Sequence, residues 1–473
     1  MGTSKQTQSL INQIAQKCEY WEKDQNVYEG SEKEVEILTL HLLDILGISQ
    51  ENIKAPYQCG ASKKVDFAAK FESSVQTSTF AKPDLIIECK SPSISFTDET
   101  KKYADTVFQL QGYLRGIKCK SVSYGIIFNG LNVQLFRKHG MLSYPISPIL
   151  SVNQKNISQT IKYLQQNIQT NNNKRGTIIT VWNNKGGVGK TTIAQSLAIL
   201  LNEKITYGNK EKNRVLLVDY DHNQGDLTAN CKMDPSEGET KRLLDADYLK
   251  KLTTEDINNS LHSFTNIPVK GRKPRFSFEV KVLRADQELS RLSSEYIKDF
   301  AANERLALRK LCLRMAKNFD YIVIDAPPNY EQSIFSKEAV SAADCILPVA
   351  LYQNDNSIRN YARAAIDHIQ STQKIRKDGG PYSLGIWFNR WRSTWIATVT
   401  RNSVKKQIDA ASNTKNQIEL KRIFYKNKGR ELRKIVETAD IARSIMDAKG
   451  LPGVVRFIRA RSAFDFLLNE FSD

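Results

Sequence analysis

The first 140 residues alternate between segments of helical and of strand periodicity. Before the first strand, Ser31 suits a helix N-cap with Glu34 three residues later as in a capping box, and Gly47 suits the end of that helix. Asn129-Gly130 predicts a hairpin turn. The pattern predicts helices within 1–30 and at 31–46 and 97–114, and strands at 65–71, 85–90, 122–128 and 133–137. We therefore expect a compact α/β domain of order α-β-β-α-β-β over residues 1–164.

A polar stretch without aromatic residues or periodicity follows, and it predicts a linker at 165–175. From Gly176 onward, apolar strand-like runs alternate with helical patterns. Such alternation is typical of a doubly wound, mostly parallel sheet. We expect this α/β domain over 176–400, followed by a basic helical extension over 401–473. The predicted strands of its sheet are 177–182, 215–219, 280–284, 320–325, 345–349 and 384–388.

A glycine-rich loop, Lys185-Gly-Gly-Val-Gly-Lys-Thr-Thr192, connects the strand 177–182 to a helical pattern. Its glycines let backbone N–H groups close around phosphate oxygens, and the N-terminus of the next helix favours negative charge. In a P-loop of this form, Lys190 reaches the β- and γ-phosphates and Thr191 ligates Mg²⁺. A glycine turn in a sugar or dinucleotide site is the alternative, which the strand–loop–helix context disfavours. The predicted ATP site comprises Gly186, Gly187, Val188, Gly189, Lys190, Thr191 and Thr192.

Two apolar strands farther along the chain end in acidic residues. The first continues into Asp219 and Asp221, and the second ends at Asp325. An acid at the carboxyl end of a strand beside a P-loop fits a role in holding Mg²⁺, which we assign to Asp325. Asp219 or Asp221 is positioned to orient the attacking water. A single strand-end aspartate is as often a helix N-cap, but three of them with a P-loop favour nucleotide hydrolysis.

A second candidate site lies in the N-terminal domain. Asp66 is on one predicted strand, and Glu88 and Lys90 are on the next. Because Glu88 and Lys90 are two residues apart, they share one face of their strand. Two acids and a lysine on adjacent strands can bind Mg²⁺ or Mn²⁺ and activate a water for attack on a phosphodiester. On its own, Glu-x-Lys on a strand is more often structural.

The chain has a net charge of +18 and a sequence pI of about 9.4. The excess is concentrated in residues 371–473, which contain 21 Lys and Arg against 10 Asp and Glu. This concentration favours a polyanionic partner, most simply DNA bound without sequence preference. A solvated basic face without a partner is the alternative. The candidate DNA contacts are Lys426, Lys428, Arg430, Arg433, Lys434, Arg456, Arg459 and Arg461.

The seven cysteines are scattered and form no CxxC pair. This spacing favours free thiols in a reducing compartment over disulfides or a zinc site. The N-terminus lacks an apolar signal core, and no run approaches 18 apolar residues. We therefore expect a cytoplasmic, nucleoid-associated protein that does not bind membranes.

The loop Lys185–Thr192 resembles the deviant Walker A motif of the ParA/MinD/Soj family of ATPases. Residues 215–221 and 320–328 resemble that family's second acidic motif and Walker B motif, and the resemblance covers about residues 175–390 and extends into the tail. It implies a homodimer that sandwiches ATP, in which Lys185 reaches the partner's phosphates and stabilises the transition state. Asn389 matches the family's adenine-reading residue. The family's Asp-Pro-Gln-Gly-Asn is replaced by Asp-His-Asn-Gln-Gly-Asp at 221–226, and Asp221 is the residue expected to position water.

Residues 31–137 resemble the PD-(D/E)xK nuclease fold, and closely the N-terminal domain of type I restriction R subunits. The resemblance implies that Asp66 and Glu88 bind metal, that Lys90 steadies the nucleophile, and that Glu32 (or Glu34) completes the site. Gln109 and Tyr113 match a Gln-x-x-x-Tyr motif found near the site in several branches. A degenerate nuclease fold that only binds DNA is the alternative.

These features give two main hypotheses. The first is an ATP-dependent, dimerising DNA-binding ATPase coupled to a metal-dependent DNA endonuclease, in prokaryotic genome defence or a mobile element. The second is a plasmid or chromosome partition ATPase whose N-terminal domain binds DNA or a partner, such as an adaptor or centromere-binding protein. A regulator whose ATP state controls partner binding is a third.

Overall fold

A computed structural model describes most of the chain. The described residues are 5–23, 32–71, 82–97, 100–168, 175–206, 211–265, 277–292, 306–351, 358, 365–391, 395–411, 417, 420–421, 424–426, 431–436 and 464–471. The chain divides into two compact units. The N-terminal unit is Met1–Lys174 with Lys377–Gly380, and the C-terminal unit is Arg175–Arg376 with Pro381–Asp473.

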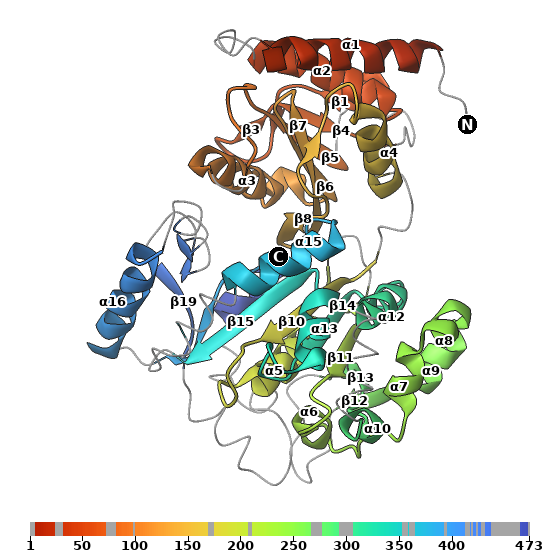
Figure 1. Cartoon of the computed structure of the whole chain (residues 1–473), viewed down its shortest axis with the longest axis vertical. Helices are drawn as coiled ribbons and strands as arrows, with labels where there is room; N and C mark the ends of the chain where they lie inside the picture. Colours follow the sequence, from red (N-terminus) through yellow and green to blue (C-terminus); the bar gives the residue numbers. More distant parts are fainter. Residues whose placement is uncertain are drawn as a thin grey trace. The chain divides into compact units, whose positions relative to one another are not determined.

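The N-terminal unit is a mixed sheet with helices on both faces (Figure 1). Its sheet has the order β1-β4-β5-β6-β7-β8, in which β5 and β6 are parallel and β9 pairs with β7. A separate hairpin, β2–β3, precedes β4. The elements are α1 (Lys5–Lys23), α2 (Glu32–Ile45), η1 (Gln50–Asn52), β1 (Ile53–Lys54), β2 (Tyr57–Gln58), β3 (Lys64–Val65), β4 (Phe67–Ala69), β5 (Leu85–Cys89), α3 (Lys101–Leu114), η2 (Ile117–Cys119), β6 (Tyr124–Phe128), β7 (Asn132–His139), β8 (Leu142–Pro145), β9 (Leu150–Ser151) and α4 (Ile157–Ile168).

Two hydrophobic clusters lie on the two faces of this sheet. One joins α1, α2 and α4 to β4, β5 and β6, and includes the fully buried Trp21. The other joins the β2–β3 hairpin and α3 to the opposite face. Because β5 is buried at every position, its side chains pack into both clusters. This explains why Leu85–Ile87 is a short continuous apolar run rather than an alternating pattern.

Trp21 anchors α1 against the β6–β7 turn. That turn has Gly130 at φ 83°, a conformation that favours glycine. A Cβ added to Gly130 would lie 2.2 Å from Cζ3 of Trp21. The thiol of Cys18, one turn earlier in α1, donates to the Gly130 carbonyl at 2.7 Å. The Asn-Gly turn seen in the sequence is therefore also the seat of the N-terminal helix.

The C-terminal unit is built on a second, larger sheet. Its order is β12-β13-β11-β14-β10-β15-β17-β19-β18, with β16 pairing with β15. All pairings are parallel except those of the two outer strands, β12 and β18. The strands are β10 (Thr177–Trp182), β11 (Val215–Asp219), β12 (His262–Thr265), β13 (Glu279–Leu283), β14 (Tyr321–Asp325), β15 (Cys345–Leu351), β16 (Tyr382–Ser383), β17 (Trp387–Trp391), β18 (Tyr425–Lys426) and β19 (Glu431–Val436).

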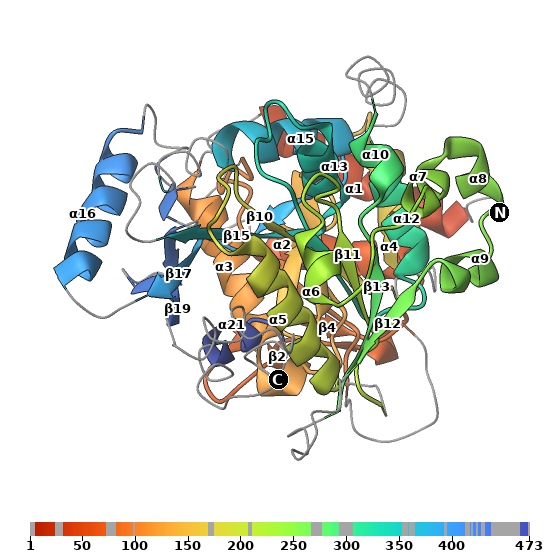
Figure 2. The same ribbon diagram turned by 90° about the horizontal axis from the view of Figure 1, so that it is seen from below.

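Helices cover both faces of this sheet (Figure 2). α5 lies on one face, and α12 and α13 lie on the other with most of the apolar core. α5 is buried at nearly every position, as expected for a helix packed on a central part of the sheet. The helices are α5 (Lys190–Glu203), α6 (Asp226–Asn230), α7 (Glu239–Leu244), α8 (Ala246–Lys251), α9 (Thr254–Asn259), α10 (Gln287–Ser290), α12 (Ala307–Met315), α13 (Ile334–Ala342), η4 (Ala365–Ile369), α15 (Gln370–Arg376), α16 (Trp395–Asp409) and α21 (Asp465–Leu468).

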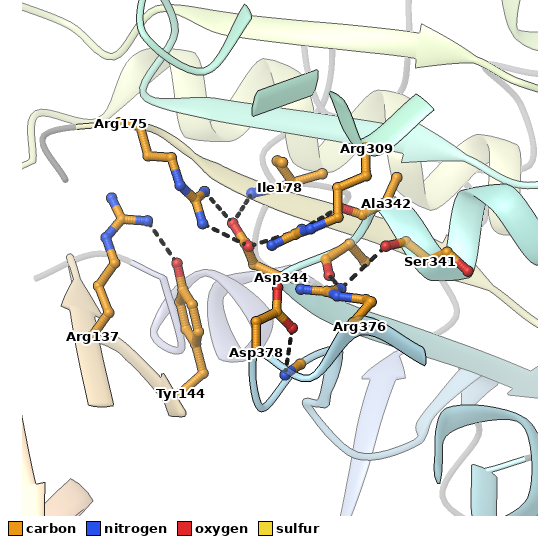
Figure 3. Close-up of polar contacts among 12 residues, drawn as sticks. Arg137, Tyr144, Arg175, Ile178, Arg309, Ser341, Ala342, Asp344, Arg376 and Asp378 are labelled. Atoms are coloured by element: carbon orange, nitrogen blue, oxygen red, sulfur yellow. Dashed lines mark hydrogen bonds and ion pairs between the residues drawn. The ribbon is translucent and has the colours of Figure 1, made fainter. Parts of the chain in front are cut away.

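Asp344 joins three elements of the C-terminal unit at the amino ends of β10 and β15 (Figure 3). Arg175 donates to its carboxylate with both terminal nitrogens, at 2.6 and 2.9 Å. Arg309 of α12 lies 3.4 Å from the same carboxylate, and the Ile178 amide donates to it at 3.1 Å. Because Asp344 is almost fully buried, these donors offset the cost of removing its charge from water.

The predicted doubly wound, mostly parallel sheet is confirmed, but the predicted strand 384–388 is replaced by two strands, β16 and β17. Three further predictions differ in detail. The predicted strand 65–71 is interrupted at Asp66, which lies between β3 and β4. α4 continues to Ile168, so the first residues of the predicted linker are helical. The extension 401–473 is not wholly helical, because β18 and β19 continue the sheet. In that segment, Leu432 of β19 packs on the core, and this tertiary contact overrides the basic, polar composition.

The Gly130→Ala substitution is expected to lower the free energy of unfolding of the N-terminal unit by about 3 kcal/mol, from the left-handed backbone and the clash with Trp21. Urea unfolding of the full chain, followed by hydrogen exchange in residues 5–168, measures the change. Gly60→Ala is the matched control, since its Cβ would meet nothing within 4 Å. Equal stability of the two variants would contradict the role given to this turn.

Candidate functional site

The P-loop follows β10 and leads directly into α5. Gly187 and Gly189 have φ of 72° and 94°, which only glycine adopts readily. A Cβ at Gly186 or Gly187 would meet nothing within 4 Å, so the loop surface there is open. The loop thus has the free backbone surface that a phosphate cradle requires.

Two asparagines that sequence reasoning missed hold this loop. The side chain of Asn183 accepts from the Lys185 amide at 2.8 Å. The side chain of Asn184 accepts from the Tyr330 amide at 2.6 Å, and its carbonyl accepts from the Asn329 amide at 3.0 Å. The P-loop is therefore tied to the segment that follows β14. Their position could have been recognised in the sequence, because two polar residues follow immediately after a fully buried strand.

The sheet brings Lys190, Asp221 and Asp325 together. The pKa of Asp325 is raised, first by burial and then by Asp219, while a hydrogen bond from Thr191 opposes the shift. The pKa of Lys190 is lowered by burial, against the influence of Asp325 and Asp221. Asp325 is almost fully buried, and its Oδ1 has no hydrogen-bond partner in the protein. A buried carboxylate oxygen without a donor, next to a threonine hydroxyl, fits the ligand chemistry of Mg²⁺.

Asp219 has a different environment from the one expected of a nucleotide contact. It lies beside Asp325 in the β11–β14 register and is fully buried. Its Oδ2 accepts from the Thr228 amide at 2.8 Å and from the Thr228 hydroxyl at 2.7 Å. The pKa of Asp219 is raised to about 6, chiefly by burial, and these bonds oppose the shift. Asp219 thereby fixes α6 to the end of β11.

Asn389, predicted to contact adenine, lies against the P-loop. Its amide donates to the Val188 carbonyl at 2.9 Å. A Cβ at Gly189 would lie 2.3 Å from the same amide nitrogen, so glycine at this position also serves the contact. The side-chain oxygen Oδ1 of Asn389 accepts from the Arg390 amide at 2.9 Å. Asn389 therefore connects β17 to the phosphate loop.

His222 stands where the resembling family has proline. It is buried, and its Nδ1 accepts from the Asp286 amide at 3.1 Å. Its ring packs edge-on against Tyr220 and Phe335. Next to it, the partly exposed Asp221 has its pKa raised mainly by burial. His222 thus fixes the loop containing Asp221 to the start of α10, a role that the sequence did not predict.

In the N-terminal unit, Asp66, Glu88 and Lys90 also come together. Phe67 pairs with Ile87, which brings Asp66 to the end of β5, where its carboxylate accepts from the Cys89 amide at 2.6 Å. Lys90 is ion-paired with Oε1 of Glu88. Oε2 of Glu88 is buried and has no partner. Burial, followed by Asp66, raises the pKa of Glu88 to about 7, against the effect of Lys90. For Lys90, burial lowers the pKa, but Glu88 outweighs it and the net shift is upward.

The first turn of α2 lies near this cluster. The pKa of Glu36 is raised by burial, then by Asp66 and Glu32, so Glu36 faces the cluster although sequence reasoning did not single it out. The sequence could have indicated Glu36, because it lies four residues after Glu32 and therefore on the same helix face. Glu34, the alternative to Glu32, is instead ion-paired with Lys17 at 2.7 Å.

Gln109 and Tyr113 lie at the other side of the cluster. Gln109 donates to the Tyr113 hydroxyl at 2.6 Å. Burial raises the pKa of Tyr113, the hydrogen bond from Gln109 opposes this, and Glu88, Lys90 and Asp66 have smaller influences. In the described part of the chain, no group of three or more His, Cys, Asp or Glu residues is arranged to hold a metal ion. Asp66 and Glu88 are the two acids that the pairing of β4 with β5 brings together.

The predicted DNA contacts of the tail are outside what the structure describes. Five of the predicted DNA contacts fall outside the described residues: Lys428, Arg430, Arg456, Arg459 and Arg461. The predicted helix N-cap Ser31 also falls outside them. For Lys426, Arg433 and Lys434 only the backbone is described, in β18 and β19.

Two general expectations bear on the environment of the chain. All seven cysteines are free thiols and are buried, as their scattered spacing predicted. Among the described helices, none is long and apolar enough to cross a membrane.

Comparison with known proteins bears on the C-terminal unit. Residues 176–376 match a family model described as an AAA domain. The chromosome partitioning protein ParA of Myxococcus xanthus is 31% identical over 174 residues, which cover 36% of this chain and 51% of ParA. The sporulation initiation inhibitor protein Soj of Bacillus subtilis is 28% identical over 179 residues, which cover 36% of this chain and 57% of Soj. Residues 176–376 form a ParA-type P-loop ATPase domain.

The likeness to this ATPase type has a limited extent. The chain spans about half the length of the curated relatives it matches. Among solved structures, apo McdA of Cyanothece gives a TM-score of 0.45 at 19% identity, covering 62% of this chain and 98% of McdA. The family model ends at residue 376, before β17 and Asn389.

We expect His222 to make the ATPase domain sensitive to mild acid. Burial lowers the pKa of His222 to about 4, against a weaker influence of Asp286, whereas an unfolded histidine titrates near 6.5. Its contribution is thus complete above about pH 6.5 and is lost as the pH falls towards 4. Between about pH 7 and pH 5, wild type should lose about 2 kcal/mol more than His222→Asn, which keeps an acceptor for the Asp286 amide. Urea titrations at the two pH values test this, and parallel losses would refute it.

Proposed function

We propose that the chain is an ATP-dependent, dimerising DNA-binding ATPase coupled to a metal-dependent DNA endonuclease in its N-terminal unit. The observation that carries the nuclease assignment is Glu88. It is a buried carboxylate with one oxygen held by Lys90 and the other without a partner, next to Asp66. Structural ion pairs normally satisfy both oxygens, so a carboxylate left in this state suits a metal ligand.

In the ATPase domain, the position of each residue suggests its role in binding phosphate, holding Mg²⁺ or orienting water. Lys190, at the first position of α5, is directed to the β- and γ-phosphates, and the amides of Gly186–Gly189 surround the phosphate oxygens. Thr191 and Asp325 would hold Mg²⁺, which supplies charge neutralisation at the phosphates when bound. Asp221 is partly exposed at the same edge of the sheet and orients the attacking water.

Lys185 has the role of a signature lysine in this proposal. It begins the P-loop, and its amide is fixed by Asn183, while its carbonyl accepts from Lys190 at 3.2 Å. The backbone is thus held while the side chain is left to reach outward. In an ATP-bound dimer it would contact the partner's phosphates and stabilise the transition-state charge.

In the N-terminal unit, Asp66 and Glu88 would hold Mg²⁺ or Mn²⁺, with Glu32 or Glu36 of α2 as a further acid at the edge of the site. Lys90 would orient the attacking water and offset negative charge that develops at the phosphate. Gln109 and Tyr113 would support the site from α3. Coupling of the two units through ATP-driven dimerisation would place two nuclease centres on one duplex. Such an activity suits prokaryotic genome defence or a mobile element.

The second candidate is a plasmid or chromosome partition ATPase, with an N-terminal unit that only binds DNA or a partner protein. The observation that favours it is the similarity to ParA, a chromosome partitioning protein, and to Soj. In this case the dimer, not cleavage, would be the output, and an adaptor or centromere-binding protein would be the partner. Both candidates require the same ATPase chemistry and differ in what the N-terminal unit does.

Lys185→Ala should reduce ATP hydrolysis by about 100-fold while leaving ATP binding in place, because the lysine acts on the transition state of the partner's site. Lys190→Ala should abolish binding as well, since this lysine meets the phosphates directly. Phosphate release and equilibrium binding of a fluorescent ATP analogue measure the two effects, with the exposed Lys317→Ala as the control. Hydrolysis by Lys185→Ala at the wild-type rate, or a wild type that stays monomeric with ATP in light scattering, would rule out the dimer mechanism.

The full chain should nick or linearise supercoiled plasmid in the presence of ATP and Mg²⁺ or Mn²⁺. Glu88→Gln should slow this at least about 100-fold without loss of DNA binding, because it removes a ligand charge while keeping the shape. Glu51→Gln is the matched control, as Glu51 is exposed on η1 and outside the cluster. A wild type that binds DNA but shows no metal-dependent cleavage would favour the partition function instead.

A further inference from the structure

A group of exposed cations gathers on the α3 face of the N-terminal unit. Lys63 and Lys64 lie on the β2–β3 hairpin, and Lys118 lies just beyond α3. Arg115 and Lys120 are exposed on either side of Lys118. We call these five residues the basic face. Residues 57–65 and 108–121 contain no Asp or Glu, so these segments themselves contribute no opposing charge.

Hydrogen bonds fix the hairpin to the end of α3. The Lys118 amide donates to the Cys59 carbonyl at 3.1 Å, and the Tyr57 hydroxyl donates to the Lys118 carbonyl at 3.0 Å. The Cys59 amide donates to the Lys63 carbonyl at 2.9 Å, which closes the hairpin. The backbones that support Lys63 and Lys118 are therefore linked through one residue, Cys59.

Two glycines lie where the hairpin and the α3 segment approach each other closely. A Cβ at Gly116 would lie 2.4 Å from the Cys59 carbonyl oxygen, so a larger residue there would separate the two segments. A Cβ at Gly112 would lie 3.4 Å from the ammonium nitrogen of Lys63. Lys63 therefore extends over α3, and the cations of both segments belong to one surface.

The basic face borders the acidic cluster. The hairpin ends at Val65, and the next residue is Asp66. Cys59 of the hairpin and Tyr113 of α3 pack in one hydrophobic cluster with Ile86 of β5, the strand that carries Glu88, which places the acidic cluster beside both segments. A polyanion held on Lys63, Lys64 and Lys118 would thus lie next to Asp66, Glu88 and Lys90.

We propose that the basic face binds the phosphate backbone of double-stranded DNA and presents it to the Glu88 cluster. The choice of DNA rests on the proposed nuclease function, whereas the position of the surface rests on the contacts above. Lysine ammonium groups act as point charges on phosphates and carry no base information, so this binding is independent of sequence. An acidic protein or an anionic membrane fits less well. The face presents one strongly exposed apolar side chain, Ile117, whereas insertion into a membrane needs a continuous exposed apolar surface.

The test measures DNA binding by the full chain without nucleotide and with EDTA, so that neither ATP-driven binding nor cleavage contributes. A labelled duplex of about 30 base pairs is titrated by fluorescence anisotropy at salt concentrations from about 50 to 200 mM. The variant Lys63→Gln/Lys64→Gln/Lys118→Gln should bind about tenfold more weakly at the lowest salt, and its slope of log Kd against log salt should fall by up to about 3.

The matched control is Lys155→Gln/Lys162→Gln, two exposed lysines at α4, which packs on the other face of the sheet. It should bind as wild type does, and both variants should retain wild-type ATPase rate and thermal unfolding. An unchanged affinity and salt slope for the triple variant would overturn the inference, and so would clear preference for single-stranded RNA. The plasmid-cleavage assay of the wild type separates the two proposals. If the basic face governs binding but wild type never cleaves, the inference stands and the nuclease function fails.

Discussion

The central position of β10 is the constraint on which the ATPase domain depends. β10 is buried at all six positions and pairs in parallel with β14 on one side and β15 on the other. Parallel strands end at one edge of the sheet, so the register that pairs Val181 with Asp325 brings the P-loop to the acid at the end of β14. On the other side of β14, the register with β11 places Asp219 beside Asp325. At the opposite edge, Asp344 gathers two arginines and an amide, which holds the amino ends of the strands together.

Both units keep a buried carboxylate that the protein does not fully satisfy. In the ATPase domain it is Asp325, and in the N-terminal unit it is Glu88; each has one oxygen without a partner. Burial raises the pKa of each, which means that folding costs free energy that a bound cation would recover. By contrast, Asp219 and Asp344 are just as deeply buried but are surrounded by donors. This difference separates carboxylates that organise the fold from those that are available for chemistry.

The two faces of the N-terminal sheet have different tasks. One face holds α1, α2 and α4 in an apolar cluster that seats Trp21 on Gly130. The other receives the β2–β3 hairpin and α3, whose contacts through Cys59 hold exposed lysines beside the Glu88 cluster. Because the hairpin runs directly into Asp66, a change in its position would move both the cations and the first acid. Binding of a polyanion and the acid cluster are therefore coupled by a single stretch of backbone.

The sequence by itself predicted the elements and the residues of the candidate ATP site. The buried runs of β10, β11 and β14, the glycine loop and the acids that follow each strand are local signals, and parallel pairing was sufficient to predict that they meet. The sequence also predicted that Asp66, Glu88 and Lys90 lie close together, because they lie at the ends of short apolar runs. Tertiary structure decided which of these residues are already satisfied. The Thr228 hydroxyl donates to Asp219, the side-chain amide of Asn389 donates to the Val188 carbonyl, and Lys17 is ion-paired with Glu34. No local sequence pattern predicts these contacts. Tertiary structure also determines that β18 and β19 extend the sheet and that His222 fixes the Asp221 loop. It brings the β2–β3 hairpin and the end of α3 together into one basic face. Each of these features depends on packing between segments that no local sequence pattern connects.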